Sequence, residues 1–302
     1  MNHGILSYQS GSILARLPTG TRTLVHGVSF SVGESESLAL VGETGSGKTM
    51  TALSVMQLLP RGVVMQGGSV CFEGKTLAAG EMKRFLGKQV VYIPQNGLEF
   101  LNPARSVKKQ LYDSLKRMGV PRAERRNAAL ERLRIAGFDV PTAVLEQYPF
   151  QLSGGMAQRV TIAISACSEA KLILADEPTN GLDAEGKAQF IRMLSELFPK
   201  AAKLIITHDI GVAALCDRAL VLLGGRMTEY GTAKAVLQTP HHPYTRALIG
   251  ALPENGMRQT GKLRAQEGSC PFYARCEFAS ASCLGEPTRH GDTTAEWWCS
   301  RA

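Results

Sequence analysis

An apolar run followed by a glycine-rich loop is the feature that most limits what this chain can fold into. Residues 37–41 have the pattern of a buried strand and lead into a segment that matches G-x-x-x-x-G-K-[ST] at every constrained position. Residues 50–59 then contain helix-forming side chains and no glycine. Strand, loop and helix in this order predict a phosphate-binding loop, composed of Gly42, Glu43, Thr44, Gly45, Ser46, Gly47, Lys48 and Thr49.

The chemistry of this phosphate loop defines its ligands. Its glycines let the backbone turn N–H groups inward around a phosphate. Lys48 supplies a positive charge to the β- and γ-phosphates, and the Thr49 hydroxyl is placed to bind Mg²⁺. We therefore expect a nucleotide with Mg²⁺ at this loop.

A second glycine motif lies about a hundred residues further along the chain. Residues 152–156 are Leu-Ser-Gly-Gly-Met, followed by a helical pattern. Two glycines permit close approach of a ligand, and a helix N-terminus attracts an anion. Taken alone, the segment could be a serine-capped helix after a loop. Its position between the phosphate loop and an aspartate-ending strand favours a nucleotide contact through Ser153, Gly154 and Gly155.

Further candidates stand at the ends of predicted strands. The buried strand 171–175 ends in Asp176 and Glu177, and a carboxylate at this end of a parallel strand lies where ligands collect. We expect Asp176 to help hold Mg²⁺ and Glu177 to act as the general base that polarises the attacking water. Gln95 and His208 also follow apolar runs. Alone, either one would be an ordinary strand-end residue.

Taken in order, these motifs resemble those of ABC-type ATPases over about residues 24–240. Residues 152–156 resemble the signature motif of the family. The resemblance implies hydrolysis of ATP with Mg²⁺ by two ATPases paired head to tail, because a signature motif cannot reach its own phosphate loop. It assigns catalytic roles to Glu177, His208 and Gln95, Mg²⁺ binding to Thr49, Gln95 and Asp176, and the D-loop to Leu182 and Asp183.

The same resemblance implies the fold class. We expect an α/β P-loop NTPase core of the ABC type over residues 1–240, with an α-helical subdomain at about 96–158 and a small cysteine-containing C-terminal extension. Alignment with the family places Leu17 where an aromatic ring usually stacks on adenine. The nearby Tyr8 is the candidate substitute.

The C-terminal part resembles one importer subfamily. Residues 239–253 resemble the H-P-Y-T-R-x-L extension of ATPases that drive oligopeptide, dipeptide and nickel importers, and we assign residues 241–302 to this extension. The resemblance implies a subunit that powers the import of peptides, nickel or metal chelates, peripherally bound at the cytoplasmic face of the inner membrane. It implies as partners a second, different ATPase, two permeases and an extracytoplasmic substrate-binding protein, with no nucleic acid.

Four cysteines are concentrated in this extension. Cys270, Cys276, Cys283 and Cys299 are separated by five, six and fifteen residues, spacings that match zinc knuckles poorly. Disulfides are not expected in a cytosolic chain. Some members of the resembling subfamily hold an iron–sulfur cluster with four such thiolates. The hypothesis is a four-iron cluster remote from the ATP site; zinc and free thiols remain the alternatives.

Composition leaves a second class of function open. The 302 residues have a net charge of +8 and contain no window of eighteen apolar residues. Residues 105–134 contain ten Lys or Arg against three acids. This basic stretch could be a solvated helix face, a docking surface, or the contact of a soluble ABC ATPase that acts on nucleic acid or ribosomes.

Overall fold

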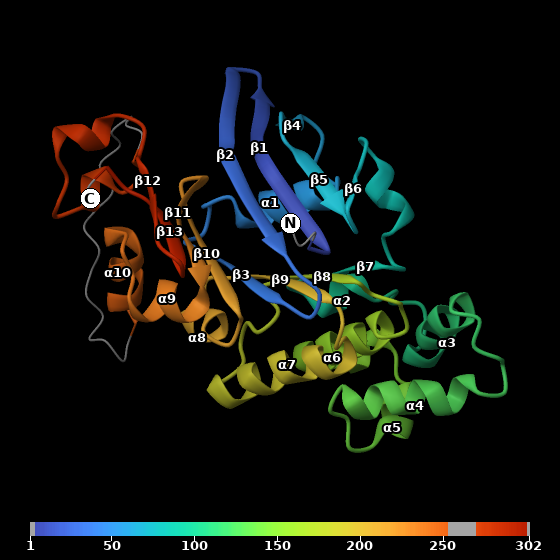
Figure 1. The fold of residues 1–302 in the computed structure, drawn as a ribbon. Coiled ribbons are helices and arrows are strands. Elements are labelled where there is room, and N and C mark those ends of the chain that lie inside the picture. The colour runs from blue at the N-terminus through green and yellow to red at the C-terminus, as the bar shows by residue number, and fades with distance from the viewer. Residues whose placement is uncertain (1–3, 253–269, 301–302) are drawn as a thin grey trace.

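The computed structural model describes residues 4–252 and 270–300 (Figure 1). Its main sheet, within these residues, has eight strands, and the central ones are parallel. The buried strands predicted at 37–41 and 171–175 are confirmed. In spatial order the strands are β12 (Arg289–Gly291), β13 (Ala295–Trp298), β11 (Arg226–Thr232), β10 (Arg218–Leu223), β3 (Ser37–Val41), β9 (Ala202–Thr207), β8 (Leu172–Asp176) and β7 (Val90–Ile93).

A second, antiparallel sheet covers one face of the main sheet (Figure 1). Its strands are β1 (Leu6–Leu17), β2 (Gly20–Val32), β4 (Val63–Gln66), β5 (Ser69–Phe72) and β6 (Lys75–Thr76). The helix α1 (Lys48–Val55) follows the phosphate loop and packs between the two sheets. The predicted strand–loop–helix order is therefore present.

Helices cover the other face of the main sheet (Figure 1). On β3, Leu38 and Leu40 face the second sheet while Ala39 and Val41 face the helices, as the two-residue period of a strand requires. The helices are α2 (Gly97–Phe100), α3 (Val107–Arg117), α4 (Arg125–Ile135), α5 (Pro141–Glu146), α6 (Gly154–Ser165), α7 (Ala184–Leu197), α8 (Ile210–Ala213), α9 (Ala233–Gln238) and α10 (Pro243–Gly250). Short 3-10 turns occur at Glu81–Arg84, Pro149–Gln151, Tyr273–Arg275 and Ala281–Leu284.

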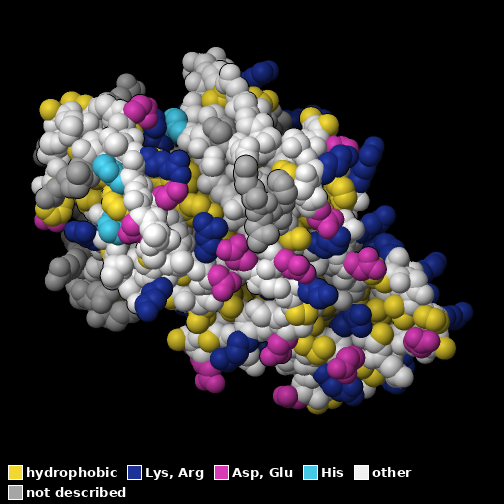
Figure 2. All heavy atoms as spheres, viewed as in Figure 1, with side chains coloured by type: hydrophobic (Ala, Val, Ile, Leu, Met, Phe, Trp, Pro, Cys, Tyr) yellow, Lys and Arg dark blue, Asp and Glu magenta, His cyan; other side chains and the backbone are white. Residues whose placement is uncertain are grey.

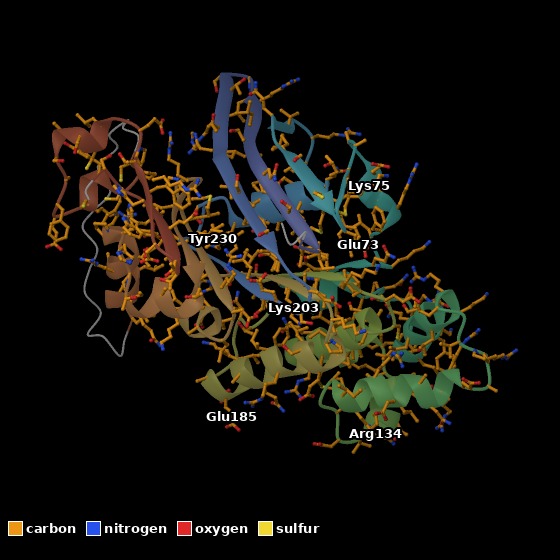
Figure 3. All side chains as sticks on the ribbon, in the orientation of Figure 1. Glu73, Lys75, Arg134, Glu185, Lys203 and Tyr230 are labelled. Carbon is orange, nitrogen blue, oxygen red and sulfur yellow. The ribbon has the colours of Figure 1, made fainter. Side chains whose placement is uncertain are left out.

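The basic stretch lies on α3 and α4, at the end of the molecule furthest from the C-terminal extension (Figure 1). Figure 2 shows Lys and Arg there interspersed with acidic side chains. Arg134, labelled in Figure 3, pairs with Glu131, and Lys108 pairs with Glu146. Part of this positive charge is therefore compensated within the chain.

The C-terminal extension joins the main sheet and does not stand apart from it. Strand β13 pairs with β11, and β12 pairs with β13. The ring of Trp297 on β13 stacks on His241 at 3.9 Å between centroids. Tyr230 of β11 lies between the main sheet and β2, where its hydroxyl accepts a hydrogen bond from the Ser31 amide (Figure 3). In the described residues no helix is long and apolar enough to cross a bilayer.

Candidate nucleotide site

The phosphate loop joins β3 to α1 and encloses the amine of Lys48. Gly47, at φ +98°, forms the left-handed N-cap of α1, a backbone conformation that favours glycine. The buried Lys48 Nζ donates to the carbonyls of Gly42 at 2.6 Å and Glu43 at 3.1 Å. Burial lowers the pKa of Lys48, while the carboxylates of Glu177, Asp176 and Glu43 oppose that shift. A cation is therefore held where the phosphates would lie.

A cavity of about 570 Å³ opens over this loop. Residues from four predicted motifs line it together, although they are far apart in the sequence. Arg22, Thr23, Leu24 and Asn180 also line it, and the motif analysis missed them. The predicted lining residues are Thr44, Gly45, Gly47, Lys48, Thr49, Gln95, Asp176, Glu177 and His208.

The candidate Mg²⁺ ligands converge at one side of the cavity. Asp176, the last residue of β8, is 6 % exposed and hydrogen-bonds to the side chain of Thr49. Burial raises the pKa of Asp176, and the Thr49 and Tyr92 hydroxyls oppose this by stabilising the carboxylate. The Tyr92 hydroxyl lies 3.3 Å from Asp176 Oδ2. A bound Mg²⁺ would stabilise the carboxylate further, so the donor set suits this ion.

Glu177 and His208 meet at the mouth of the cavity. Glu177 Oε2 lies 2.8 Å from His208 Nδ1 and 3.4 Å from the His208 backbone nitrogen. Glu177 has φ +45°, an uncommon conformation for a residue with a Cβ. Its amide donates to the Ile206 carbonyl at 2.8 Å and helps to hold this turn. Such strain at a cleft is typical of functional positions.

The segment that follows Gln95 contacts α6, the helix that begins in the signature motif. Gly97 packs so closely on α6 that a Cβ there would come within 2.6 Å of the Gln158 amide nitrogen. Thr161 of α6 donates to the Gly97 carbonyl at 3.2 Å. Gln158 in turn donates to the carbonyl of Pro178, directly after Glu177. One helix therefore contacts the loops of both Gln95 and Glu177.

The signature motif is not among the residues that line the cavity over its own phosphate loop. Ser153 caps α6 by accepting the Met156 amide at 3.3 Å, as the simple helix-cap interpretation requires. Gly154 and Gly155, however, are exposed, and a Cβ on either would meet nothing within 4 Å. Nothing in the surrounding structure requires these glycines for space. Ser153 and Gly155 line a different cavity, together with the D-loop residue Leu182.

Burial and hydrogen bonding show what Tyr8, Leu17 and Asp183 contact. Tyr8 is fully buried, stacks on Phe30 and bonds to the Ser54 hydroxyl, so the prediction that it substitutes for the adenine-stacking aromatic is wrong. Leu17 is 48 % exposed and is not among the residues that line the cavity. Asp183 of the predicted D-loop caps α7 by accepting the Gly186 amide at 2.8 Å.

The four cysteines of the extension line one small cavity, together with His242 and Phe272. Burial raises the pKa of the Cys270 and Cys276 thiols, while backbone N–H groups of Phe272 and Phe278 favour the thiolates. Among residues 4–252 and 270–300, no group of three or more His, Cys, Asp or Glu is placed to hold a metal ion.

The segment that bears the cysteines contacts the phosphate loop. Arg275, between two of the cysteines, forms an ion pair with Glu43 of that loop. The cavity lined by the cysteines shares no lining residue with the nucleotide cavity, and a cluster remote from the ATP site stays a prediction. Sequence separation does not reveal the Arg275 contact, because it depends on how the C-terminal extension packs against the core.

Comparison with known proteins agrees with this geometry. Residues 25–180 match the model of the family described as ABC transporter, and residues 228–283 match the oligopeptide/dipeptide transporter C-terminal region. The chain is 35 % identical to the dipeptide transport ATP-binding protein DppD of Bacillus subtilis, over 97 % of this chain and 94 % of that protein. It is 36 % identical to a probable peptide ABC transporter ATP-binding protein, y4tR, of Sinorhizobium fredii, over 85 % and 82 % respectively.

A solved structure has the same fold. The dimeric, ADP- and phosphate-bound post-hydrolysis state of the ATP-binding cassette MJ0796 aligns with a TM-score of 0.65 and 24 % identity. It covers 76 % of this chain and 98 % of that chain. Fold, site geometry and sequence relatives lead to one assignment: the chain belongs to the ABC transporter family, as an ATP-binding and ATP-hydrolysing subunit.

Proposed function

We propose that this subunit powers the import of peptides, and that it is peripherally bound at the cytoplasmic face of the inner membrane. The C-terminal match to oligopeptide/dipeptide transporters and the names of the two relatives, which are those of peptide and dipeptide transport proteins, support this cargo over nickel or a metal chelate. The observation that carries the proposal is the assembled catalytic set, in which Glu177 and His208 are 2.8 Å apart beside Lys48 and Asp176.

We assign the steps of hydrolysis to side chains of this site. Lys48 neutralises phosphate charge, while Thr49 and Asp176 would hold Mg²⁺, which would supply further positive charge to the phosphates. Glu177 accepts a proton from the attacking water, and His208 fixes the orientation of the Glu177 carboxylate. Gln95 lines the cavity and transmits nucleotide binding to α6 through the contacts of Gly97.

The second half of the site is proposed to come from a partner ATPase of different sequence. Exposed Ser153, Gly154 and Gly155 lie outside the cavity above Lys48, and the glycines leave room for close approach of a phosphate. The D-loop residues Leu182 and Asp183 lie beside the signature and would meet the partner on the same face. The dimeric form of the related MJ0796 cassette supports this arrangement.

A hollow of about 770 Å³ is the proposed contact for the two permeases. It lies between the core and the helical subdomain, and exposed apolar side chains such as Leu58 and Phe100 line it. Arg117 of α3 adds positive charge at its edge. Phe100→Asp should release the subunit from co-expressed permeases while ATP binding persists; unchanged co-purification would contradict this contact.

We propose that the cysteine cavity holds a four-iron cluster. All four thiols line one enclosed space, and backbone N–H groups favour two of the thiolates, as such a cluster needs. In a tetrahedral zinc site the sulfurs lie only about 3.8 Å apart, given Zn–S bonds of about 2.3 Å. A cluster distributes its ligands over four irons and accepts wider spacing.

The test of the cluster is chemical analysis of protein purified without oxygen. Brown protein with matching iron and sulfide, bleached by Cys283→Ser, supports the cluster. Colourless protein with stoichiometric zinc assigns the site to zinc, and protein with neither metal leaves four free thiols.

The transport proposal and the nucleic-acid alternative are separated by one experiment. The chain, its partner ATPase, the two permeases and an extracytoplasmic substrate-binding protein are reconstituted in vesicles, and ATP-dependent uptake is measured for di- and oligopeptides and for Ni²⁺. We expect peptide uptake. ATPase activity stimulated by DNA, RNA or ribosomes, without uptake, would contradict the proposal. The relatives reported above are transport proteins and give that alternative no support.

The division into a domain at 1–240 and an extension at 241–302 stays a proposal. The extension supplies its own β12 and β13, but these strands continue the main sheet. Likewise, α2–α5 lie within the predicted helical subdomain at 96–158.

A further inference from the structure

The C-terminal extension reaches the phosphate loop through Arg275. Its guanidinium binds Glu43 with two parallel contacts, Nη1 to Oε1 at 2.8 Å and Nη2 to Oε2 at 3.2 Å. The Arg275 side chain is only 6 % exposed, and it lies over the ring of Phe272. A bidentate pair of this kind fixes orientation as well as charge, because both partners are planar.

A second contact from the extension fixes the backbone of the same residue. The Tyr244 hydroxyl accepts the Glu43 amide at 3.2 Å, and the Tyr244 side chain is fully buried. Helix α10, which holds this tyrosine, is itself anchored. Its N-cap His242 accepts the Tyr244 amide at 3.0 Å, and the buried Glu229 accepts the amides of His241 and His242.

The charge of Glu43 makes these contacts consequential for nucleotide binding. Its carboxylate acts on Lys48, since it is among the groups that oppose the lowering of the Lys48 pKa. An unpaired carboxylate in the phosphate loop would repel a triphosphate. The bidentate Arg275 contact cancels this charge while the Tyr244 hydroxyl holds the loop backbone.

We propose that Arg275 and Tyr244 are positioning residues of the phosphate loop, so that the C-terminal extension sets the affinity of this subunit for ATP. The extension also contacts the rim of the cavity, where Pro271 packs against Gly224. This inference rests on the ATPase site and not on the cargo, so it can fail while the peptide-import proposal holds.

The test measures MgATP affinity of the full chain, together with KM and kcat of the paired ATPase. Arg275→Met keeps an aliphatic side chain over Phe272 but leaves Glu43 unpaired. We expect about tenfold weaker MgATP binding, in the range usual for coupling between sites, with the loss in KM and not in kcat. Adding Glu43→Gln to this variant should restore affinity to within about threefold of wild type, because the repulsive charge is then gone.

A matched control exists at another ion pair between the core and the extension. Arg226 of β11 binds Glu286 with the same two-contact geometry, at 2.9 and 3.3 Å, and also joins the core to the extension. Arg226→Met should leave MgATP affinity within about twofold of wild type. Tyr244→Phe removes only the acceptor and should weaken binding by less than Arg275→Met.

Two results would overturn the inference. One is an Arg275→Met variant that binds MgATP no more weakly than Arg226→Met. The other is a double variant with Glu43→Gln that stays as weak as Arg275→Met, which would mean that Arg275 serves packing alone. Thermal unfolding of each variant shows whether the fold persists, and a loss of affinity from unfolding would not be rescued by Glu43→Gln.

Discussion

Replacing Glu177 with glutamine tests the catalytic assignment at a single atom. Glutamine has the same shape and retains an oxygen or nitrogen beside His208 Nδ1, now 2.8 Å from Glu177 Oε2. The fold and the nucleotide cavity should therefore persist. What disappears is the carboxylate that takes the proton of water. Loss of a general base lowers turnover by about 10²- to 10⁴-fold, which is about 3 to 5 kcal/mol of barrier.

The assay measures phosphate release by the paired subunits. MgATP binding is measured in parallel. The matched control is Glu185→Gln, because this glutamate points away from the core on the outer side of α7 (Figure 3). Glu177→Gln should bind MgATP normally and accumulate as an ATP-bound pair, while Glu185→Gln should behave as wild type. Turnover of Glu177→Gln within about threefold of wild type would refute the reasoning.

Three further outcomes are expected. Lys48→Ala should weaken MgATP binding by about 10- to 100-fold, measured by titration, because charged hydrogen bonds to phosphate are lost. Ser153→Arg should leave MgATP binding to the isolated chain unchanged but abolish hydrolysis by the pair, since the signature serves the partner's site. Amides and a hydroxyl lower the pKa of Asp292 to about 2, so its stabilisation of the β12–β13 turn is complete above about pH 4 and is lost towards pH 2. Tryptophan fluorescence should report this loss of stability, because both tryptophans lie on β13. The Asp292→Ala variant should not show this change of fluorescence with pH.

The parts of the site that sequence could predict depend on local rules. Lys48 and Thr49 follow from a loop between strand and helix, and Asp176 from an acid at the end of an apolar strand. The structure places these residues around one cavity, as the parallel order of β3, β8 and β9 requires. Because all of these strands end at the same edge, motifs far apart in sequence become neighbours.

Contacts across the fold had no such local signal. Side chains on β1 alternate between its two faces, and this pattern does not show what the Tyr8 hydroxyl contacts. Its hydrogen bond with Ser54 in the core depends on the position of α1. Arg22 and Leu24 belong to a strand whose pattern shows burial but not the cavity above it. In the sequence, Arg275 cannot be told apart from a surface arginine. Its ion pair with Glu43 follows from the packing of the C-terminal extension on the core.

The pairing of β13 with β11 determines what a shortened chain would look like. A chain that stopped at residue 240 would leave β11 as an open sheet edge with unpaired amides and carbonyls, a ready template for intermolecular strand addition. In the intact chain the outermost strand at this edge is β12, which is only three residues long and begins with the charged Arg289. We therefore expect variants that lack the extension to aggregate more readily than the intact chain, and shortened variants made for solubility should retain it.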